Sequence, residues 1–269
     1  MANDGPDGEQ HERRAAGLGP RRYDPLVLVL IYLLAVSALF IAAPGIDLSV
    51  ARLFHTSSGF PALENPVLLK LRQLGDQLVI LVMVVMVTSI IGKLVWWQRP
   101  MAMRPRSIVF LAGSLALGPG LLVNGLMKTY SGRPRPIQTN LFGGHWHFMP
   151  AWHFSGACPS NCSFVSGEGA TAIWLLAPVM LLPKELRLVV GVPIGLLGLA
   201  LSLNRMAFGG HYLSDILLSF GITAAVMLAL HRLIVSGPLG AKIDARGEAL
   251  LTRAGLRLSR LAVGKTRKG

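Results

Sequence analysis

Three groups of polar residues interrupt an otherwise apolar chain, and their side chains are of the kinds that bind phosphate. Lys128, Arg135 and Arg205 are cations, and the guanidinium forks of the two arginines match phosphate oxygens. Ser166 and Gly167 stand just ahead of an apolar run, where the free amides and the dipole of a beginning helix favour an anion. Together these residues predict a phosphate-binding site.

A histidine and a carboxylate lie close to these cations in the sequence. His211 and Asp215 are four residues apart, so they share a helical face if the helix already includes His211. A carboxylate bonded to one imidazole nitrogen fixes the tautomer and leaves the other nitrogen free to attack. Asp215 is the only acidic residue between Glu185 and Asp244, and a lone acid in an apolar span is a functional candidate.

Each group also has an ordinary structural explanation. A single Lys or Arg at a helix end is commonly an interface anchor, a His-x-x-x-Asp pair a local hydrogen bond, and Ser-Gly before a helix a cap. Coincidence of all three on one face of the molecule favours a functional site over three unrelated structural roles.

The composition identifies the kind of element that must position these residues. Of the 269 residues, 52% are hydrophobic and only 14% are charged, against roughly 25% in a soluble domain. This is the composition of an integral membrane protein. The residue pattern indicates an all-α fold, a bundle of six transmembrane helices. The six predicted spans are Pro25 to Ala43, Leu78 to Trp97, Ile108 to Met127, Gly169 to Leu182, Leu188 to Phe208 and Tyr212 to Ile234.

The distribution of Lys and Arg predicts the orientation of this bundle. These residues concentrate in the N-terminal segment, in the connections after the second and fourth spans and in the C-terminal tail, which places both termini in the cytoplasm. All three polar groups then lie on the outer face. The predicted organisation is a cytoplasmic segment over 1–24, the membrane domain over 25–234 and a basic tail over 235–269.

The tail accounts for much of the net charge of +13 without a nucleic-acid partner. Leu250, Ala254, Leu258 and Leu261 fall at helical spacing, and arginines occupy another face. One interpretation is an amphipathic helix on the anionic inner leaflet, and the other is a disordered basic tail that enforces the topology.

The three motifs resemble those of the type-2 phosphatidic acid phosphatase superfamily. That family's pattern is Lys-x6-Arg-Pro, then Pro-Ser-Gly-His, then Ser-Arg-x5-His-x3-Asp. The first motif is complete at Lys128 and Arg135-Pro136, and the third is complete except for Asn204 in place of Ser. The second departs twice, with Val165 in place of Pro and Glu168 in place of His.

The resemblance implies a reaction without a metal or another cofactor. His211 attacks phosphorus and forms a phosphohistidine, Asp215 orients His211, and water hydrolyses the intermediate. Lys128, Arg135, Arg205, Ser166 and the Gly167 amide hold the phosphoryl oxygens and stabilise charge in the transition state.

Glu168 stands where the family has the histidine that protonates the leaving oxygen, and it is the only acidic residue between Asp76 and Glu185. Two roles follow. Glu168 is a general acid that carries a proton, or it stays ionised and positions an arginine, His211 or the substrate head group. The sequence leaves this choice open, because burial and phosphate would raise its pKa while the cations would lower it.

The length and the prolines of the connection from Lys128 to Val165 indicate an ordered cap or a binding loop rather than a second domain. Its histidines and tryptophans, such as Trp146 and Trp152, serve either as interface anchors or as a lid over a lipid head group. Cys158 and Cys162 would meet oxidising conditions on the outer side, and we expect them to form a disulfide that braces the second motif.

The expected substrate is a phospholipid or glycolipid phosphate, and the expected location is a bacterial inner membrane with the site facing the periplasm. The run from Cys158 to Glu168 is similar to that of phosphatases acting on lipid A, the phosphorylated glycolipid of Gram-negative outer membranes. Undecaprenyl diphosphate, phosphatidylglycerol phosphate and phosphatidic acid stay open as substrates, as does phosphoryl transfer between lipids. The sequence does not indicate an oligomeric state.

Overall fold

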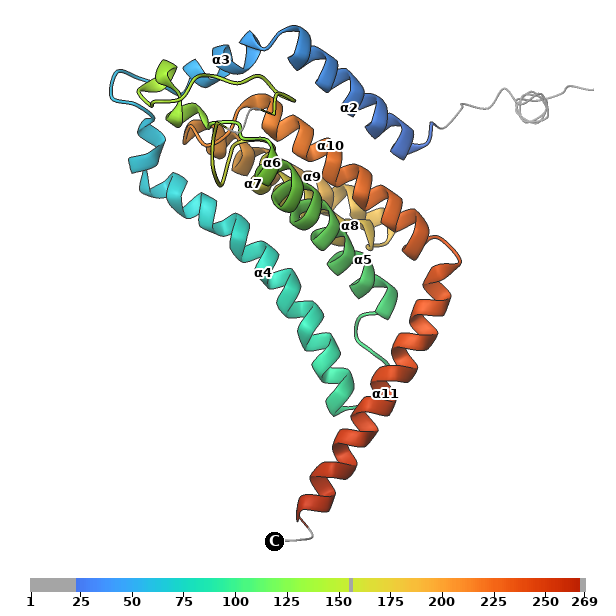
Figure 1. The fold of residues 1–269 in the computed structure, drawn as a ribbon. Coiled ribbons are helices and arrows are strands. Elements are labelled where there is room, and N and C mark those ends of the chain that lie inside the picture. The colour runs from blue at the N-terminus through green and yellow to red at the C-terminus, as the bar shows by residue number, and fades with distance from the viewer. Residues whose placement is uncertain (1–22, 155–156, 267–269) are drawn as a thin grey trace, which may run out of the picture.

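The computed structural model describes residues 23–154 and 157–266, so most of the N-terminal segment over 1–24 lies outside the described residues. The described part is helical, and five of its helices are long and apolar enough to cross a membrane. They are α2 (Pro25–Ala42), α4 (Pro66–Val95), the continuous run Pro105–Tyr130, α9 (Lys184–Ala207) and the run Leu213–Val235. Figure 1 shows these five lying roughly along one direction.

The run Pro105–Tyr130 is built from α5 (Pro105–Leu115), η2 (Ala116–Met127) and α6 (Lys128–Tyr130). Its middle part, η2, is wound as a π-helix. Pro119 explains this change, because a proline has no amide hydrogen for the ordinary bond to Leu115 and its ring needs space. The Asn124 side chain donates to the Pro119 carbonyl over 2.7 Å. This bond holds the Asn124 side chain one turn before Lys128.

The fourth predicted span differs from expectation. It is a pair of short helices, α7 (Gly167–Trp174) and α8 (Leu176–Met180), so the count of six long spans is not confirmed among the described residues. The break follows from Pro178, which cannot donate to the Trp174 carbonyl. Trp174 is fully buried and its indole donates to Ser114 over 2.9 Å. The α7–α8 pair is thus a central element of the bundle.

The second span is longer than its apolar run. Helix α4 begins at Pro66, twelve residues before the predicted start at Leu78, because Asn65 caps its first amides and Pro66 occupies the first turn. This extension places Arg72 and Asp76 on a helix beside α7. The last span consists of α10 (Leu213–Leu230) and η5 (His231–Val235), and α10 packs against α2 and α7.

Shorter elements cover the end of the bundle at which α4 begins and α9 ends, which we call the site end. They are α3 (Gly45–Arg52), η1 (Pro61–Glu64), η3 (Pro136–Gln138) and η4 (Asn140–Phe142). The connection after η4 contains a disulfide between Cys158 and Cys162, as the sequence predicts.

The opposite end is crossed by α11 (Leu239–Thr266), which runs across the ends of α4 and α5 (Figure 1). Lys93 pairs with Glu248 over 2.5 Å, and Arg106 pairs with Asp244 over 3.2 Å. Lys93 is therefore buried under α11. Leu250, Leu258 and Leu261 remain exposed on α11.

Candidate active site

His211 is held in a tight turn between α9 and α10. Gly209 makes this turn with a φ of 60°, and a side chain there would strike the ring of Phe60. The imidazole is buried, with Nδ1 2.9 Å from the Ser163 carbonyl oxygen and Nε2 3.2 Å from Glu168 Oε2. A carbonyl oxygen only accepts, so Nδ1 carries a hydrogen. This leaves Nε2 as the nitrogen that faces the other polar groups of the site.

Asp215 does not hydrogen-bond to His211 as the i, i+4 spacing predicts. Its Oδ2 atom is 3.8 Å from Nδ1, which is too long for a hydrogen bond. The reason is that α10 begins at Leu213, so His211 lies outside the helix. Asp215 instead accepts from the Ser163 hydroxyl over 2.5 Å and from the Tyr212 amide over 2.9 Å. Ser163 thus connects Asp215 to the imidazole, through its hydroxyl on one side and its carbonyl on the other.

A buried ionic network lies behind Asp215, and the three motifs do not predict it. The Arg133 guanidinium donates to Asp215 over 2.6 Å and to Asp47 over 2.7 Å, and its Nε donates to the Met149 carbonyl. Ser214 donates to Asp47 through both its amide and its hydroxyl. Arg133, Asp47 and Asp215 all have no exposed surface. Every charge in the network is therefore hydrogen-bonded, which buried ions require.

The network also shifts the pKa values of Arg133 and Asp47, which both lie outside the membrane spans. Burial alone would lower the pKa of the Arg133 guanidinium, but the Asp215 and Asp47 carboxylates raise it above its ordinary value. Burial raises the pKa of the Asp47 carboxyl, and the positive charge of Arg133 opposes this shift. The sequence contains two signals of this network. Arg133 lies two residues before Arg135, and Asp47 is the only acidic residue between Asp24 and Glu64.

Glu168 lies between His211 and two arginines. Its Oε1 atom is 3.1 Å from Arg205 Nε and 3.6 Å from a terminal nitrogen of Arg72. Arg205 is buried, whereas Arg72 is about half exposed. Arg72 and Arg205 also line a small cleft with Asp76 and Glu168. Arg72 is a further site residue that the three motifs do not identify, because it lies in α4, ahead of the apolar part of that helix.

The start of α7 brings Lys128 and the second motif together. Ser166 caps this helix by accepting from the Gly169 amide over 3.0 Å. A Cβ atom at Gly167 would lie 2.6 Å from the Asn124 side chain and 3.2 Å from Lys128 Nζ. A side chain at this position would therefore displace Asn124 and crowd Lys128. A polar cleft of about 300 Å³ opens next to Lys128 and is also lined by Asn161.

Arg135 is held by the loop that the disulfide closes. Its Nε donates to the Asn161 carbonyl over 3.1 Å, and a terminal nitrogen donates to the Asn161 side chain over 2.6 Å. Asn161 has a φ of 51°, a conformation that asparagine tolerates better than most residues. Burial lowers the pKa of Arg135, but a guanidinium remains charged at neutral pH.

The structure therefore gathers the predicted residues at one end of the bundle. Glu168 contacts both His211 and Arg205, and Lys128 lies beside Gly167 at the start of the same helix, which Ser166 caps. Asp215 lies behind the imidazole through Ser163, and Arg135 is held by Asn161. Within the described residues, no three His, Cys, Asp or Glu side chains come close enough to hold a metal ion together.

Several known proteins are similar to this chain. The PAP2 superfamily matches residues 107–236. A lipid A 4'-phosphatase from Rhizobium leguminosarum is 37% identical over 213 residues, which cover 73% of this chain and 90% of that protein. One from Francisella tularensis subsp. novicida is 40% identical over 112 residues, which cover 41% of this chain and 50% of that protein. No solved structure matches the chain. The chain therefore belongs to the PAP2 superfamily, as its motifs indicate.

Proposed function

We propose that this chain is a membrane phosphatase that removes phosphate from a lipid through a phosphohistidine on His211. The observation that carries this proposal is the hydrogen bond between His211 Nδ1 and the Ser163 carbonyl, which leaves Nε2 as the nitrogen facing Glu168 and Arg205. Membership of the family and the 37% identity to a lipid A 4'-phosphatase support a lipid phosphate as the substrate.

In the first step, His211 Nε2 attacks phosphorus, and the bond from phosphorus to the lipid oxygen breaks. Lys128, Arg135 and Arg205 balance the charge on the phosphoryl oxygens, and the free amides at the start of α7 add to this effect. The lipid oxygen needs a proton as it leaves. Glu168 is the acid closest to the nucleophile, so we assign the proton to it.

The surroundings of Glu168 set the state from which it acts. Burial would raise the pKa of its carboxyl group, but His211, Arg205 and Lys128 hold that pKa below its ordinary value. Without substrate the carboxylate pairs with Arg205 over 3.1 Å and faces His211 Nε2 over 3.2 Å. The negative charge of a bound phosphate opposes these cations and raises the pKa, so in this proposal Glu168 takes up its proton when the lipid phosphate binds. In the second step the Glu168 carboxylate takes a proton from water, hydroxide attacks phosphorus, and the phosphorus–nitrogen bond breaks.

A lipid A-type glycolipid is the favoured substrate because two relatives from different genera carry that name. Undecaprenyl diphosphate and phosphatidylglycerol phosphate are the alternatives of the same chemical class. A lipid-to-lipid phosphotransferase would use the same phosphohistidine with a lipid hydroxyl in place of water. The proposed location is the inner membrane, with the site facing the periplasm and both termini in the cytoplasm.

The decisive experiment measures phosphate release from a panel of purified lipid phosphates by wild type and His211→Ala. We expect wild type to release phosphate from a lipid A-type substrate and His211→Ala to be inactive while eluting normally in gel filtration. A folded His211→Ala protein with the wild-type rate would overturn the mechanism. A phosphorylated lipid in place of free phosphate would assign the transferase reaction.

A further inference from the structure

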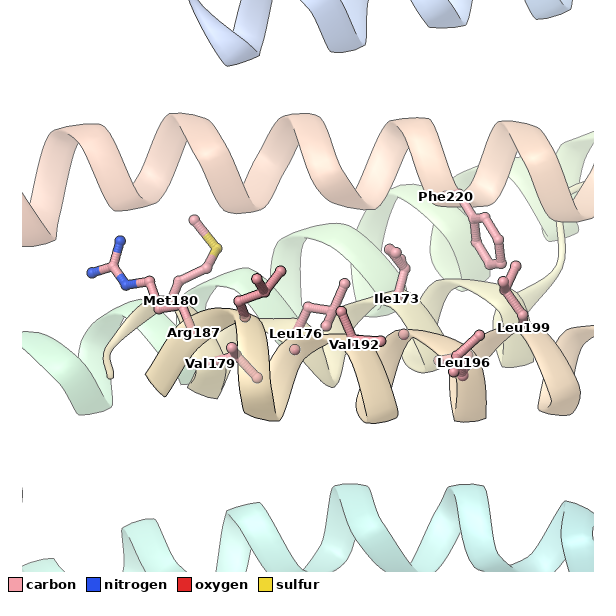
Figure 2. Close-up of a pocket in the computed structure, with 14 residues that line it drawn as sticks. Ile173, Leu176, Val179, Met180, Arg187, Val192, Leu196, Leu199 and Phe220 are labelled. Carbon is pink, nitrogen blue, oxygen red and sulfur yellow. The ribbon is translucent and has the colours of Figure 1, made fainter. Parts of the chain in front are cut away.

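An apolar groove of about 620 Å³ lies along α9, away from the proposed site. Its walls come from α7, α8, α9 and α10, and include Ile173, Leu176, Leu196, Leu199 and Phe220 (Figure 2). Gly191 and Gly195 line the groove without a side chain that would fill it. A Cβ atom at Gly195 would meet no other atom within 4 Å. The groove is therefore open space at the depth of the spans.

The groove has a basic end. Arg187 and Met180 lie together at one end of it, and Phe220 and Leu199 lie at the other (Figure 2). The helical rise from residue 187 to residue 199 corresponds to about 18 Å. Arg187 lies in the first turn of α9, just ahead of the predicted span that begins at Leu188, so it marks the level at which the polar part of an occupant would lie.

The same two residues, Arg187 and Met180, also line a second cleft of about 390 Å³. Arg104, Arg106 and Ser107 complete the polar part of its wall. Arg106 pairs with Asp244. Arg187 donates only its Nε, to the Leu182 carbonyl, and no ion pair to Arg104 or Arg187 occurs within residues 23–154 and 157–266. This cleft, which we call the arginine cleft, therefore has more positive charge than the Asp244 carboxylate neutralises.

We infer that the two spaces together form a binding site for an anionic glycerophospholipid, with the phosphate in the arginine cleft and an acyl chain in the apolar groove. Basic pockets between transmembrane helices bind acidic lipid head groups in this way. An apolar space of this length next to three arginines matches an amphipathic lipid, whereas a soluble anion would leave the groove unfilled.

This site is separate from the one that we propose for catalysis. Arg187 and Arg205 lie on the same helix, and the rise between them corresponds to about 27 Å. The arginine cleft therefore belongs to the leaflet opposite the site end, whichever way the protein is inserted. The far end of the groove reaches Ala172 and Ile173 on α7, the helix whose first turn carries Glu168. A lipid in the groove would cover that helix, so its binding should stabilise the fold.

The test measures the retention of phosphatidylglycerol by the purified full chain in native mass spectrometry, with phosphatidylcholine as the uncharged comparison. Phosphatidylglycerol has a phosphodiester and no phosphate monoester. Arg104→Gln/Arg187→Gln removes the two unpaired charges, and we expect about tenfold weaker retention. Gly195→Leu fills the groove and should have the same effect. Arg253→Gln and Gly45→Leu are matched controls outside the site, and they should bind like wild type.

A second readout is the rise in Tm that phosphatidylglycerol causes, which the two test variants should lose. Equal retention and an equal rise in Tm by wild type and both variants would overturn the inference. Loss of phosphatidylglycerol from folded His211→Ala would also overturn it, because the lipid would then occupy the catalytic region. Retention by His211→Ala together with loss from Gly195→Leu would support the inference, whatever the phosphatase assays show.

Discussion

Glu168 Oε2 lies 3.2 Å from His211 Nε2, so this carboxyl group stands beside the nitrogen that we propose as the nucleophile. If Glu168 gives a proton to the leaving oxygen, Glu168→Gln should slow the first chemical step by about 10²–10⁴-fold for poor leaving groups. Good leaving groups need no proton, so they should be affected much less. Single-turnover kinetics with substrates of graded leaving-group pKa would measure this. Equal slowing across the series would assign Glu168 to positioning alone.

Arg133 connects Asp215 to Asp47 in a fully buried network. Arg133→Met would leave two buried carboxylates without their partner, which costs about 3–5 kcal/mol. We expect a large drop in Tm and the loss of most activity, because Asp215 and Ser163 would no longer be held behind the imidazole. Thermal unfolding and phosphate release would measure both effects. Arg52→Met, at an exposed arginine of α3, is the control, and comparable losses in both variants would contradict this role.

Asn161 holds Arg135 through both its carbonyl and its side chain. Asn161→Gly preserves the positive φ but removes the side-chain acceptor, so we expect kcat/KM to fall about tenfold, the order of a hydrogen bond to a charged group. Asn161→Asp keeps an acceptor and should retain most activity. Equal activity of the Gly variant and wild type would show that Arg135 needs no such support. Removal of both cysteines should act in the same direction as Asn161→Gly.

Arg72 extends from α4 toward Glu168 and is about half exposed. Arg72→Gln should raise KM a few-fold and change kcat little, because the side chain reaches the cleft beside the site without contacting His211. Steady-state kinetics on the preferred lipid phosphate would separate the two parameters. Lys70→Gln is the control, since Lys70 is exposed on the same helix. A fall in kcat with KM unchanged would place Arg72 in the chemical step.

The orientation in the membrane can be tested with single added cysteines. Ser58 lies in an exposed turn at the site end, and Ser236 is exposed at the opposite end beside α11. A membrane-impermeant maleimide applied to cells with a permeabilised outer membrane should label Ser58→Cys and leave Ser236→Cys unlabelled until the inner membrane is lysed. The reverse pattern would place the site in the cytoplasm.

The sequence predicts the long apolar spans to within a few residues at most of their ends, because membrane thickness dictates a run of apolar residues. The prediction of spans fails where a helix carries charged residues. The first turns of α4 contain Lys70, Arg72 and Asp76, so the sequence predicts that Arg72 lies in a loop. It also fails where a proline breaks an apolar run, as Pro178 does between α7 and α8.

The spacing of the three motifs predicts which residues meet, and the structure brings them together. The contact between His211 and the Ser163 carbonyl could not be predicted, because it depends on the start of α10 two residues after His211. The role of Asp47 could not be predicted either. It depends on contacts with Arg133 and Ser214, which lie 86 and 167 positions away along the chain, and no periodicity in the sequence records such pairings.

The position of Asp47 limits which segments of this enzyme can be exchanged for those of another protein. The region that matches the superfamily begins at residue 107, yet the carboxylate that completes the Arg133 network belongs to α3, and Arg72 belongs to α4. The matching region is therefore not a self-sufficient module. A chimera that grafts it onto other leading helices would keep the Arg133 network only if those helices supply a carboxylate at the place of Asp47.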